Sequence, residues 1–436
     1  MQKKSVILLL VLVLSAGIAA GETVLTVDQV RKLALEYNRQ FLAARKELDR
    51  ARGDIIAARA GALPQLSLDG RYTRNITERE LFFAGEKVPI SLNNDFSLSL
   101  SLTQPLYVGG KVGSAMQVAR IYDRYSKEKV RQIEAEIIYS AESLFYSAIL
   151  AESHLEVLEK AYEQFSYNYD VVDKYYGQGL VSEFELLRAR VEKANLEPQL
   201  VAAKAGLNIA QKSLKSFLGL SLDEAIAIVV DFGDTAAIEP PMLDSLVTAA
   251  LNSRPEIAQA RLQKEGYDKA VRIAKASWIY PTVSLNTSYD ITASSDDFKL
   301  ENREVSKTWT ASLLLSVPLF DGGRTIGEVR KVKVDYYQAM LAEQQMYDDV
   351  RLEVEQAYDK LIQARKALDL QKETIAQAEE GLRIANLRYE SGVGTLLEVL
   401  SAQTALTDAR TNEADAIYQF RLAKSALKKA TGIEIL

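Results

Sequence analysis

The side chains of this 436-residue chain that could do chemistry form no catalytic or metal-binding motif. The sequence has no cysteine and one histidine, His154, so thiol catalysis, disulfides and Cys/His metal sites are excluded. Gly109-Gly110 and Gly322-Gly323 are double glycines, but neither belongs to the G-x-x-x-x-G-K-[ST] motif that holds phosphate. We therefore expect no cofactor and no metal site, and we interpret the protein as a non-enzyme.

Two glutamates, Glu185 and Glu398, could either cap helices or form a ring of carboxylates in an assembly of several chains. Glu185 follows Ser182 by three residues, and Glu398 follows Thr395 by the same interval, which is the capping-box pattern of a helix start. If several chains surrounded a pore, the same carboxylates would form a ring that favours cations over anions. Helix capping is the simpler interpretation, and the two roles are compatible.

The two glutamate segments belong to a duplication that includes most of the chain. Pro105 and Pro318 are separated by 213 residues, and this offset holds over more than a hundred positions. Other identical pairs at this offset are Gly109/Gly322, Gly110/Gly323, Tyr176/Tyr389, Gly179/Gly392 and Glu185/Glu398. Earlier parts match with small slips, as Pro64 and Pro281 do. Because solenoid repeats have only about 20 to 50 residues, we interpret the chain as two similar halves.

Each half starts with a helical pattern that stops at Pro64 or Pro281 and is followed by two strand patterns. Pro105 and Pro318 are expected to end strands, because proline has no N–H for a sheet. The double glycines that follow would let the backbone turn into a helix. One strand sets Phe96, Leu98, Leu100 and Leu102 against Ser97, Ser99, Ser101 and Thr103. Such a sheet has one apolar and one polar face, which fits a membrane barrel or a half-buried soluble sheet.

Each half continues in a helix too long for a globular core. No glycine or proline interrupts 114–176, and only Gly381 interrupts 328–389, so each could extend on the order of 90 Å at about 1.5 Å per residue. A heptad seam runs from Ile137 to Val172 and returns one offset later, with Gln371 as its polar exception. Long helices with such narrow apolar seams need neighbouring helices on both sides.

Glycine turns connect each long helix to a returning helix. Gly179 and Gly392 are expected to end the long helices in the left-handed conformation. The returning helices are expected to run to about Phe217 and Ala430, with Pro198 disturbing the first. Since four strands cannot close a barrel, a sheet that lies in a membrane needs strands from several chains, and a trimer would give twelve. We therefore predict a mainly α protein, internally duplicated, whose four strands per protomer join a trimeric 12-stranded membrane β-barrel. The barrel would continue into a long α-helical barrel.

The first residues have the pattern of a secretory signal. Lys3 and Lys4 precede the apolar run 6–14 and small residues follow it, so residues 1–21 are interpreted as a cleaved signal peptide. No later apolar run is long enough for a transmembrane helix. The net charge of −6 and the scattered lysines and arginines indicate no nucleic-acid partner.

The duplicated plan and its turns, "YYGQGLVSEFELL" (175–187) and "RYESGVGTLLEVL" (388–400), resemble the TolC-like outer membrane efflux proteins. The resemblance covers essentially the whole mature chain. It implies a homotrimeric channel in the outer membrane whose helical tunnel crosses the periplasm and docks to a periplasmic adaptor and an inner-membrane pump or ABC exporter. Many relatives carry a lipidated N-terminal cysteine, which this chain lacks, so the barrel alone would anchor it in outer-membrane lipid.

The resemblance also assigns roles to particular residues. The docking surface and resting gate would lie at the turns, at Tyr176, Gly179, Ser182, Glu185, Arg388, Tyr389, Gly392, Thr395 and Glu398. Gly394 and Ser401 are neutral where some relatives carry charge. The junction of barrel and tunnel would lie at Pro64, Pro105, Gly109, Gly110, Pro281, Pro318, Gly322 and Gly323.

This interpretation divides the chain after the signal peptide into consecutive parts. They are an equatorial segment and tunnel helix (22–64), a barrel hairpin (65–107), a long helical hairpin with its tip near 176–182 (108–218), an equatorial connector (219–253), a second tunnel helix (254–281), a second barrel hairpin (282–320), a second helical hairpin with its tip near 389–395 (321–430), and a C-terminal equatorial segment (431–436).

A second class of function remains open from the residues alone. A secreted or periplasmic coiled-coil scaffold, structural or adhesive, would also contain long heptad helices and a small sheet. The sequence does not separate drug export from type I secretion of proteins, and it does not identify the cargo.

Overall fold

The computed structural model describes residues 23–77, 80–83, 86–89, 92–229, 241–296, 298 and 305–433. The predicted signal peptide lies outside these residues. The chain forms two compact units. One consists of Met1–Ala44, Arg131–Arg254 and Asp348–Leu436, and we call it the hairpin unit. The other consists of Arg45–Val130 and Pro255–Tyr347, and we call it the sheet unit.

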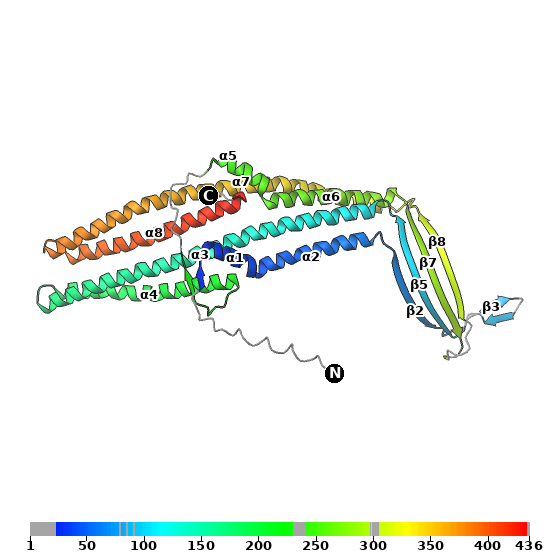
Figure 1. Ribbon diagram of the computed structural model, residues 1–436, viewed down its shortest axis with the longest axis horizontal. Coiled ribbons are helices and arrows are strands. Elements are labelled where there is room, and N and C mark those ends of the chain that lie inside the picture. Colours follow the sequence, from blue (N-terminus) through cyan, green and yellow to red (C-terminus); the bar gives the residue numbers. More distant parts are fainter. Residues whose placement is uncertain are drawn as a thin grey trace, which may run out of the picture. The chain divides into compact units, whose positions relative to one another are not determined.

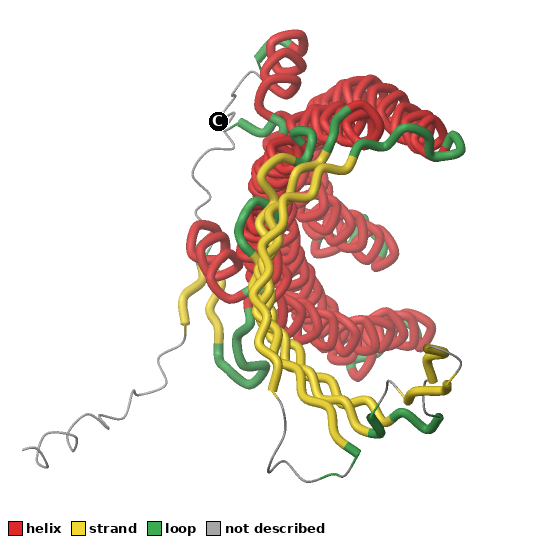
Figure 2. Tube along the Cα trace, turned by 90° about the vertical axis from the view of Figure 1, so that its right-hand side faces the viewer, coloured by secondary structure: helices red, strands yellow, loops and turns green. Residues whose placement is uncertain are grey.

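The sheet unit contains a four-stranded antiparallel sheet with strands from both halves of the sequence (Figure 1). The strand order is β2-β5-β7-β8, so the central pair β5 and β7 joins the two halves. Figure 2 shows the four strands side by side in a twisted sheet. The strands are β2 (Gln65–Arg74), β5 (Asn94–Tyr107), β7 (Thr282–Ser295) and β8 (Val305–Ser316). A small hairpin of β3 (Glu80–Phe83) and β4 (Glu86–Pro89) lies in the connection between β2 and β5.

The register of this sheet puts apolar and polar side chains on opposite faces. One row across the apolar face is Leu68, Leu100, Tyr289 and Trp309. The neighbouring row across the polar face is Ser67, Ser101, Ser288 and Thr310. Hydroxyl oxygens lie 2.9 Å apart in both the Ser67–Ser101 and the Ser288–Thr310 pairs. The predicted alternation is confirmed. On the apolar face Leu68, Trp309 and Leu313 are 64%, 79% and 67% exposed, so most of this face lies open within the described chain, and Phe298 packs against Tyr72 and Phe96.

A helix precedes each pair of sheet strands in the sequence and ends near the predicted proline. Helix α2 (Arg39–Ala60) ends shortly before Pro64, and α6 (Pro255–Ile279) ends shortly before Pro281. Within the sheet unit, α6 is tied to the first part of α3, because an Arg124 amino group donates to both carboxylate oxygens of Glu265 at 3.0 Å.

Two helical hairpins, α3/α4 and α7/α8, form most of the hairpin unit, to which α3 belongs from Arg131 and α7 from Asp348 (Figure 1). Both long helices have 67 residues and both returning helices have 36. The hairpins are α3 (Lys111–Gly177) with α4 (Glu183–Leu218), and α7 (Arg324–Glu390) with α8 (Leu396–Thr431). Two short helices, α1 (Val27–Tyr37) and α5 (Leu243–Ser253), and a parallel pair of strands, β1 (Thr23–Leu25) with β6 (Ile226–Ile228), complete the unit.

The predicted heptad seams form the core of the hairpin unit. In α3 the buried seam residues include Ile137, Ala141, Ala148, Phe165 and Val172. In α7 they include Val350, Val354, Ala357, Leu361, Ala364, Leu368, Leu382 and Ala385. Alanines at alternate positions allow close helix approach, as expected for a narrow seam. Helix α4 continues through Pro198, so the predicted disturbance does not divide it.

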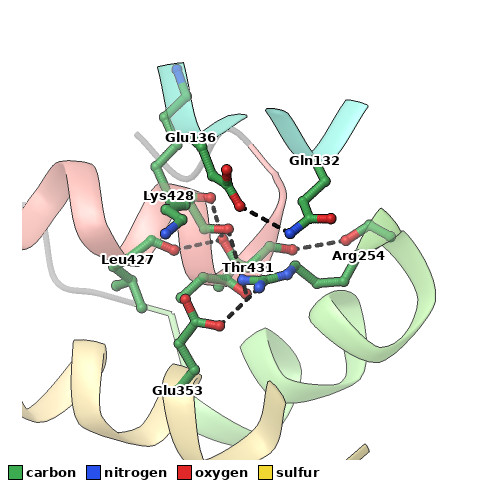
Figure 3. Close-up of polar contacts among 10 residues, drawn as sticks. Gln132, Glu136, Arg254, Glu353, Leu427, Lys428 and Thr431 are labelled. Atoms are coloured by element: carbon green, nitrogen blue, oxygen red, sulfur yellow. Dashed lines mark hydrogen bonds and ion pairs between the residues drawn. The ribbon is translucent and has the colours of Figure 1, made fainter. Parts of the chain in front are cut away.

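In each half of the sequence, a side chain donates hydrogen bonds to the carbonyl groups at the C-terminal end of the returning helix. Arg254, 6% exposed, donates from Nη1 to the carbonyls of Lys429 and Ala430 at 3.1 and 3.0 Å (Figure 3). Its Nη2 donates to Glu353 at 2.8 Å. In the first half, Asn38 Nδ2 donates to the Phe217 carbonyl at 3.1 Å. Asn38 and Arg254 are the C-cap residues of α1 and α5, so each short helix caps the end of a returning helix.

Replacing Arg254 with alanine is expected to lower the free energy of unfolding of the hairpin unit by about 2 kcal/mol, because buried helix-end carbonyls lose charged donors. Thermal unfolding of the purified chain in detergent measures the effect. Arg351→Ala is the matched control, since its pair with Glu355 at 2.9 Å is exposed to solvent and contributes little to stability. Equal losses in the two variants would contradict the capping role.

Candidate gate and docking site at the hairpin tips

Backbone caps and side-chain caps together build the turn between α3 and α4. Gly179 has a φ of 72°, and the Leu180 N–H donates to the Tyr175 carbonyl at 2.9 Å. The Ser182 hydroxyl accepts the Glu185 N–H at 3.3 Å, and the Glu185 carboxylate accepts the Ser182 N–H at 3.3 Å. The predicted capping box is confirmed at this tip.

The turn between α7 and α8 has the same backbone plan with a different side-chain contact. Gly392 has a φ of 71°, and the Val393 N–H donates to the Arg388 carbonyl at 3.0 Å. The Glu398 N–H donates to the Thr395 hydroxyl at 3.3 Å. The Glu398 carboxylate, however, accepts a bond from Arg388 Nε at 3.2 Å. The expected backbone cap is therefore present, while the carboxylate connects the two helices of the hairpin.

Gly394 lies where this second turn has no room for a side chain. A Cβ at this position would lie 2.8 Å from the Cβ of Arg388 and 2.9 Å from the backbone nitrogen of Tyr389. The Gly394 N–H also donates to the Arg388 carbonyl at 2.8 Å. This bond draws residue 394 against the end of α7, and it explains why a glycine stands here.

A groove of about 540 Å³ lies between the two tips, within the hairpin unit. Two of its lining residues, Val172 and Leu396, belong to a cluster of buried side chains that also includes Phe165, Leu186 and Leu400. The groove is lined by Glu163, Gln164, Tyr167, Asn168, Val171, Val172, Tyr175, Leu382, Asn386, Tyr389, Glu390, Gly392, Leu396, Val399 and Gln403. The walls thus come from α3, α7 and α8, and they mix apolar, amide and phenol groups.

Three lining side chains have buried polar atoms without a hydrogen-bond partner, namely Asn168 Nδ2, Tyr389 Oη and Gln403 Oε1. Gln403 is only 4% exposed. Buried polar groups are almost always paired, so each of these three atoms carries an uncompensated cost of desolvation in this arrangement. Burial, reinforced by the nearby Glu185 and Tyr175, raises the pKa of the Tyr389 phenol. Its hydroxyl therefore stays protonated and able to donate.

Some of the predicted tip residues interact with one another, and others are exposed to solvent. Arg388 donates a hydrogen bond to Glu398, and the charge of Glu185 contributes to the raised pKa of Tyr389. Tyr176 is 41% exposed at the end of α3. Sequence reasoning missed Asn168 and Gln403. For Gln403 a signal existed, because it is a polar residue in an otherwise apolar series that includes Leu396, Val399, Leu400 and Leu406.

The predicted junction residues lie at the ends of the strands in the sheet unit. Gly109 has a φ of 64°, and a Cβ there would lie 2.8 Å from the Cβ of Tyr280, so both conformation and space require glycine. Gly110, Gly322 and Gly323 also have positive φ. Strand β8 ends before Pro318, as expected. The expectation for Pro105 is wrong, because β5 continues to Tyr107, with a register shift after Pro105 where the missing N–H is tolerated.

Among the described residues, no cluster of three or more His, Cys, Asp or Glu side chains suited to a metal ion occurs. His154 lies 3.2 Å from Asp415. None of the helices in the described ranges has the length and hydropathy to span a bilayer.

These two long helical hairpins and the amphipathic sheet define a class of protein. The chain belongs to the outer membrane efflux protein family, whose model matches residues 30–220 and 246–433. The protein is accordingly an outer-membrane efflux channel with its helical domain in the periplasm.

Individual relatives extend over nearly the whole chain. Outer membrane protein TolC of Salmonella enteritidis is 23% identical over 99% of this chain and 87% of its own. Cation efflux system protein CusC of Escherichia coli O157:H7 is 23% identical over 95% of this chain and 88% of its own. The crystal structure of the Campylobacter jejuni CmeC outer membrane channel is similar with a TM-score of 0.79 at 20% identity, over 93% of this chain and 85% of that one.

Proposed function

We propose that three copies of the protein form a channel-tunnel that serves as the exit duct of a tripartite efflux pump or a type I secretion system. The observation that carries the proposal is the sheet, whose apolar face is mostly open and whose edge strands β2 and β8 each pair on one side within the described chain. In lipid, such edges need partners. Three copies would supply twelve strands, and β2 of one chain would pair with β8 of the next.

Exposed apolar side chains on the hairpins support lateral contacts between copies. Phe184 and Val191 on α4 are 69% and 55% exposed, and Leu370 on α7 is 64% exposed. Large apolar groups at this spacing on long helices favour burial against further helices. Side-by-side hairpins from three chains would enclose a helical tunnel, in which the six tips form the periplasmic end.

The tip groove is the proposed docking surface for a periplasmic adaptor. The buried, unpartnered atoms of Asn168, Tyr389 and Gln403 favour a partner that presents both donors and acceptors. An adaptor segment seated there would bias the separation of α3/α4 from α7/α8, and this separation would open the tunnel. The inner-membrane component, a pump or an ABC exporter, would supply the energy.

The parts of the chain acquire roles under this proposal. Residues 65–107 and 282–320 form barrel hairpins, and residues 108–218 and 321–430 form tunnel hairpins. The remaining parts, 22–64, 219–253, 254–281 and 431–436, supply tunnel helices and an equatorial belt. The corresponding caps by Asn38 and Arg254 support an origin by duplication.

Cell fractionation tests the proposed assembly. A channel-tunnel is expected in the outer membrane as a trimer that migrates at high apparent mass until heated, and its deletion is expected to sensitise cells to exported compounds or to stop secretion of a protein. A coiled-coil scaffold, the competing class, predicts a detergent-independent protein and no transport phenotype. Which exporter is encoded beside the gene separates drug efflux from type I secretion.

Glu398→Gln is expected to reduce the cation preference of the channel, because three copies of this exposed carboxylate would surround the periplasmic end. Reversal potentials in planar bilayers measure the preference. Glu373→Gln, an exposed position farther from the tip on α7, is the control and should leave the reversal potential unchanged. If Glu398→Gln also leaves it unchanged, Glu398 contributes only to the turn, through Thr395 and Arg388.

A further inference from the structure

A second pocket of the hairpin unit, about 180 Å³ in volume, collects positive charge. It lies between α1, α3, α7 and α8, away from the tips. Its charged lining consists of four cationic side chains and one carboxylate, namely Arg31, Arg421, Lys424, Lys428 and Glu142. The described lining therefore has a formal excess of three positive charges, which makes the pocket attractive to an anion.

The carboxylate of this pocket is already engaged by its own neighbours. Glu142 has a side chain only 2% exposed, and its Oε1 accepts a bond from Arg31 Nε. Its Oε2 accepts a bond from the Ser425 hydroxyl. Arg31 also donates to Asp28 at 2.8 Å, an exposed carboxylate that lowers the positive excess by at most one charge. Glu142 and Asp28 thus compensate Arg31 and leave the α8 cations facing the pocket.

Arg421 is a cation of this pocket with an unsatisfied donor. Its Nη2 is buried and has no hydrogen-bond partner. A guanidinium is charged at every physiological pH, and a buried donor without an acceptor is costly. Lys424 and Lys428, which have contacts of their own, place two further positive charges one and two helical turns along α8. A buried donor without a partner, in a pocket with an excess of positive charge, favours binding of an anion that accepts from it.

We propose that this pocket binds a phosphate-type oxyanion. The volume of about 180 Å³ far exceeds the roughly 15 Å³ that one water needs, so a tetrahedral anion fits. The planar fork of Arg421 suits two oxygens of such an anion, and the lysines neutralise its remaining charge. Because the pocket is lined by α1 and α3 of the first half and α7 and α8 of the second, the bound anion would hold the two halves of the hairpin unit together.

Titration of inorganic phosphate into the full-length protein in detergent tests the proposal. Sodium chloride keeps the ionic strength constant, and the readouts are the thermal unfolding temperature and the ³¹P line width of phosphate. The wild type is expected to show a saturable rise in unfolding temperature and broadening of the line, because a ligand that binds only the folded state stabilises it. Arg421→Gln is expected to weaken the apparent affinity at least tenfold.

Arg410→Gln is the matched control. Arg410 lies on the same helix but donates to Glu379 at 3.1 Å, so its loss should leave phosphate binding unchanged. Arg421→Lys keeps the charge without the fork and should bind with intermediate affinity, which preserves the test if Arg421→Gln does not fold. Glycerol 3-phosphate, the soluble analogue of a lipid headgroup phosphate, competes if the pocket accepts esterified phosphate and fails to compete if it takes only the free anion.

Two results would overturn the proposal. One is an unfolding temperature that rises with phosphate without saturation, which is the general effect of an excluded salt. The other is an identical saturable response in the wild type and Arg421→Gln. In either case a water molecule alone would satisfy Arg421 Nη2.

Discussion

Replacing Leu313 with arginine is expected to remove the trimer from the outer membrane. Leu313 is 67% exposed on the apolar face of edge strand β8, opposite Leu285. An arginine on the lipid face of a barrel costs about 2–4 kcal/mol near the bilayer midplane, and a trimer would incur it three times. Outer-membrane fractionation and the migration of unheated samples on gels measure the loss.

Ser312→Arg is the matched control for this prediction. Ser312 is the preceding residue of the same strand, and it pairs with Asn286 on the polar face. An arginine there would face the water-filled interior, so the trimer should persist, with altered ion selectivity at most. If Leu313→Arg assembles as well as Ser312→Arg, the apolar face does not contact lipid.

Gly394→Val is expected to abolish transport while the trimer still assembles. Residue 181, a valine, occupies the corresponding place in the first tip, yet the second tip cannot accept one, because a Cβ would lie 2.8 Å from Arg388 Cβ. Overpacking of this kind lowers the free energy of unfolding by about 1–3 kcal/mol. The turn would accommodate the valine by displacing Arg388 and the groove wall at Tyr389. Hydrogen exchange of residues 388–400 should accelerate by about tenfold or more, since each 1.4 kcal/mol is a factor of ten.

Gly381→Ala provides the control for the glycine substitution. Gly381 lies inside α7 with open space around its Cβ position, so alanine should stabilise the helix by about 0.5–1 kcal/mol. Transport and exchange at the tip should match the wild type. Normal transport by Gly394→Val would show that the shape of the second turn does not matter for docking.

Periodic features of the fold were predictable from the sequence. The burial of the seam from Ile137 to Val172, and of its repeat in α7, follows from the 3.5-residue spacing of the apolar residues. This spacing defines one apolar stripe on each helix, however the helices are arranged. The strand alternation around Leu100 and the cap formed by Ser182 and Glu185 are equally local. Each depends on residues within a few positions of one another, so the linear pattern contains the necessary information.

Features that depend on distant packing were not predictable in the same way. Pro105 was expected to end its strand, yet pairing with β7 carries β5 two residues further through a register shift. The contact of Arg388 with Glu398 and the exclusion of a side chain at Gly394 arise from the shape of the second turn. Asn168 and Gln403 line one groove only because α3 and α8 pack near each other. In each case the contact depends on a residue distant in the sequence, or on the backbone conformation of a turn, and neither can be deduced from the local residue types.

Disulfide cross-linking between edge strands tests the central claim of a closed intermolecular barrel. The chain has no cysteine, so introduced pairs have no background. One cysteine replaces Ser67 on β2, and the second replaces in turn one of the polar-face residues of β8, Ser306, Thr308, Thr310 or Ser312. The pair Ser288→Cys with Thr310→Cys, whose hydroxyls lie 2.9 Å apart, reports that oxidation works within one chain.

At least one β2–β8 pair is expected to yield covalently linked dimers and trimers in outer membranes, because β8 of each chain would pair with β2 of its neighbour. If every β2–β8 pair stays monomeric while the Ser288/Thr310 pair oxidises fully, the edge strands do not meet between chains, and the proposed trimeric barrel is wrong.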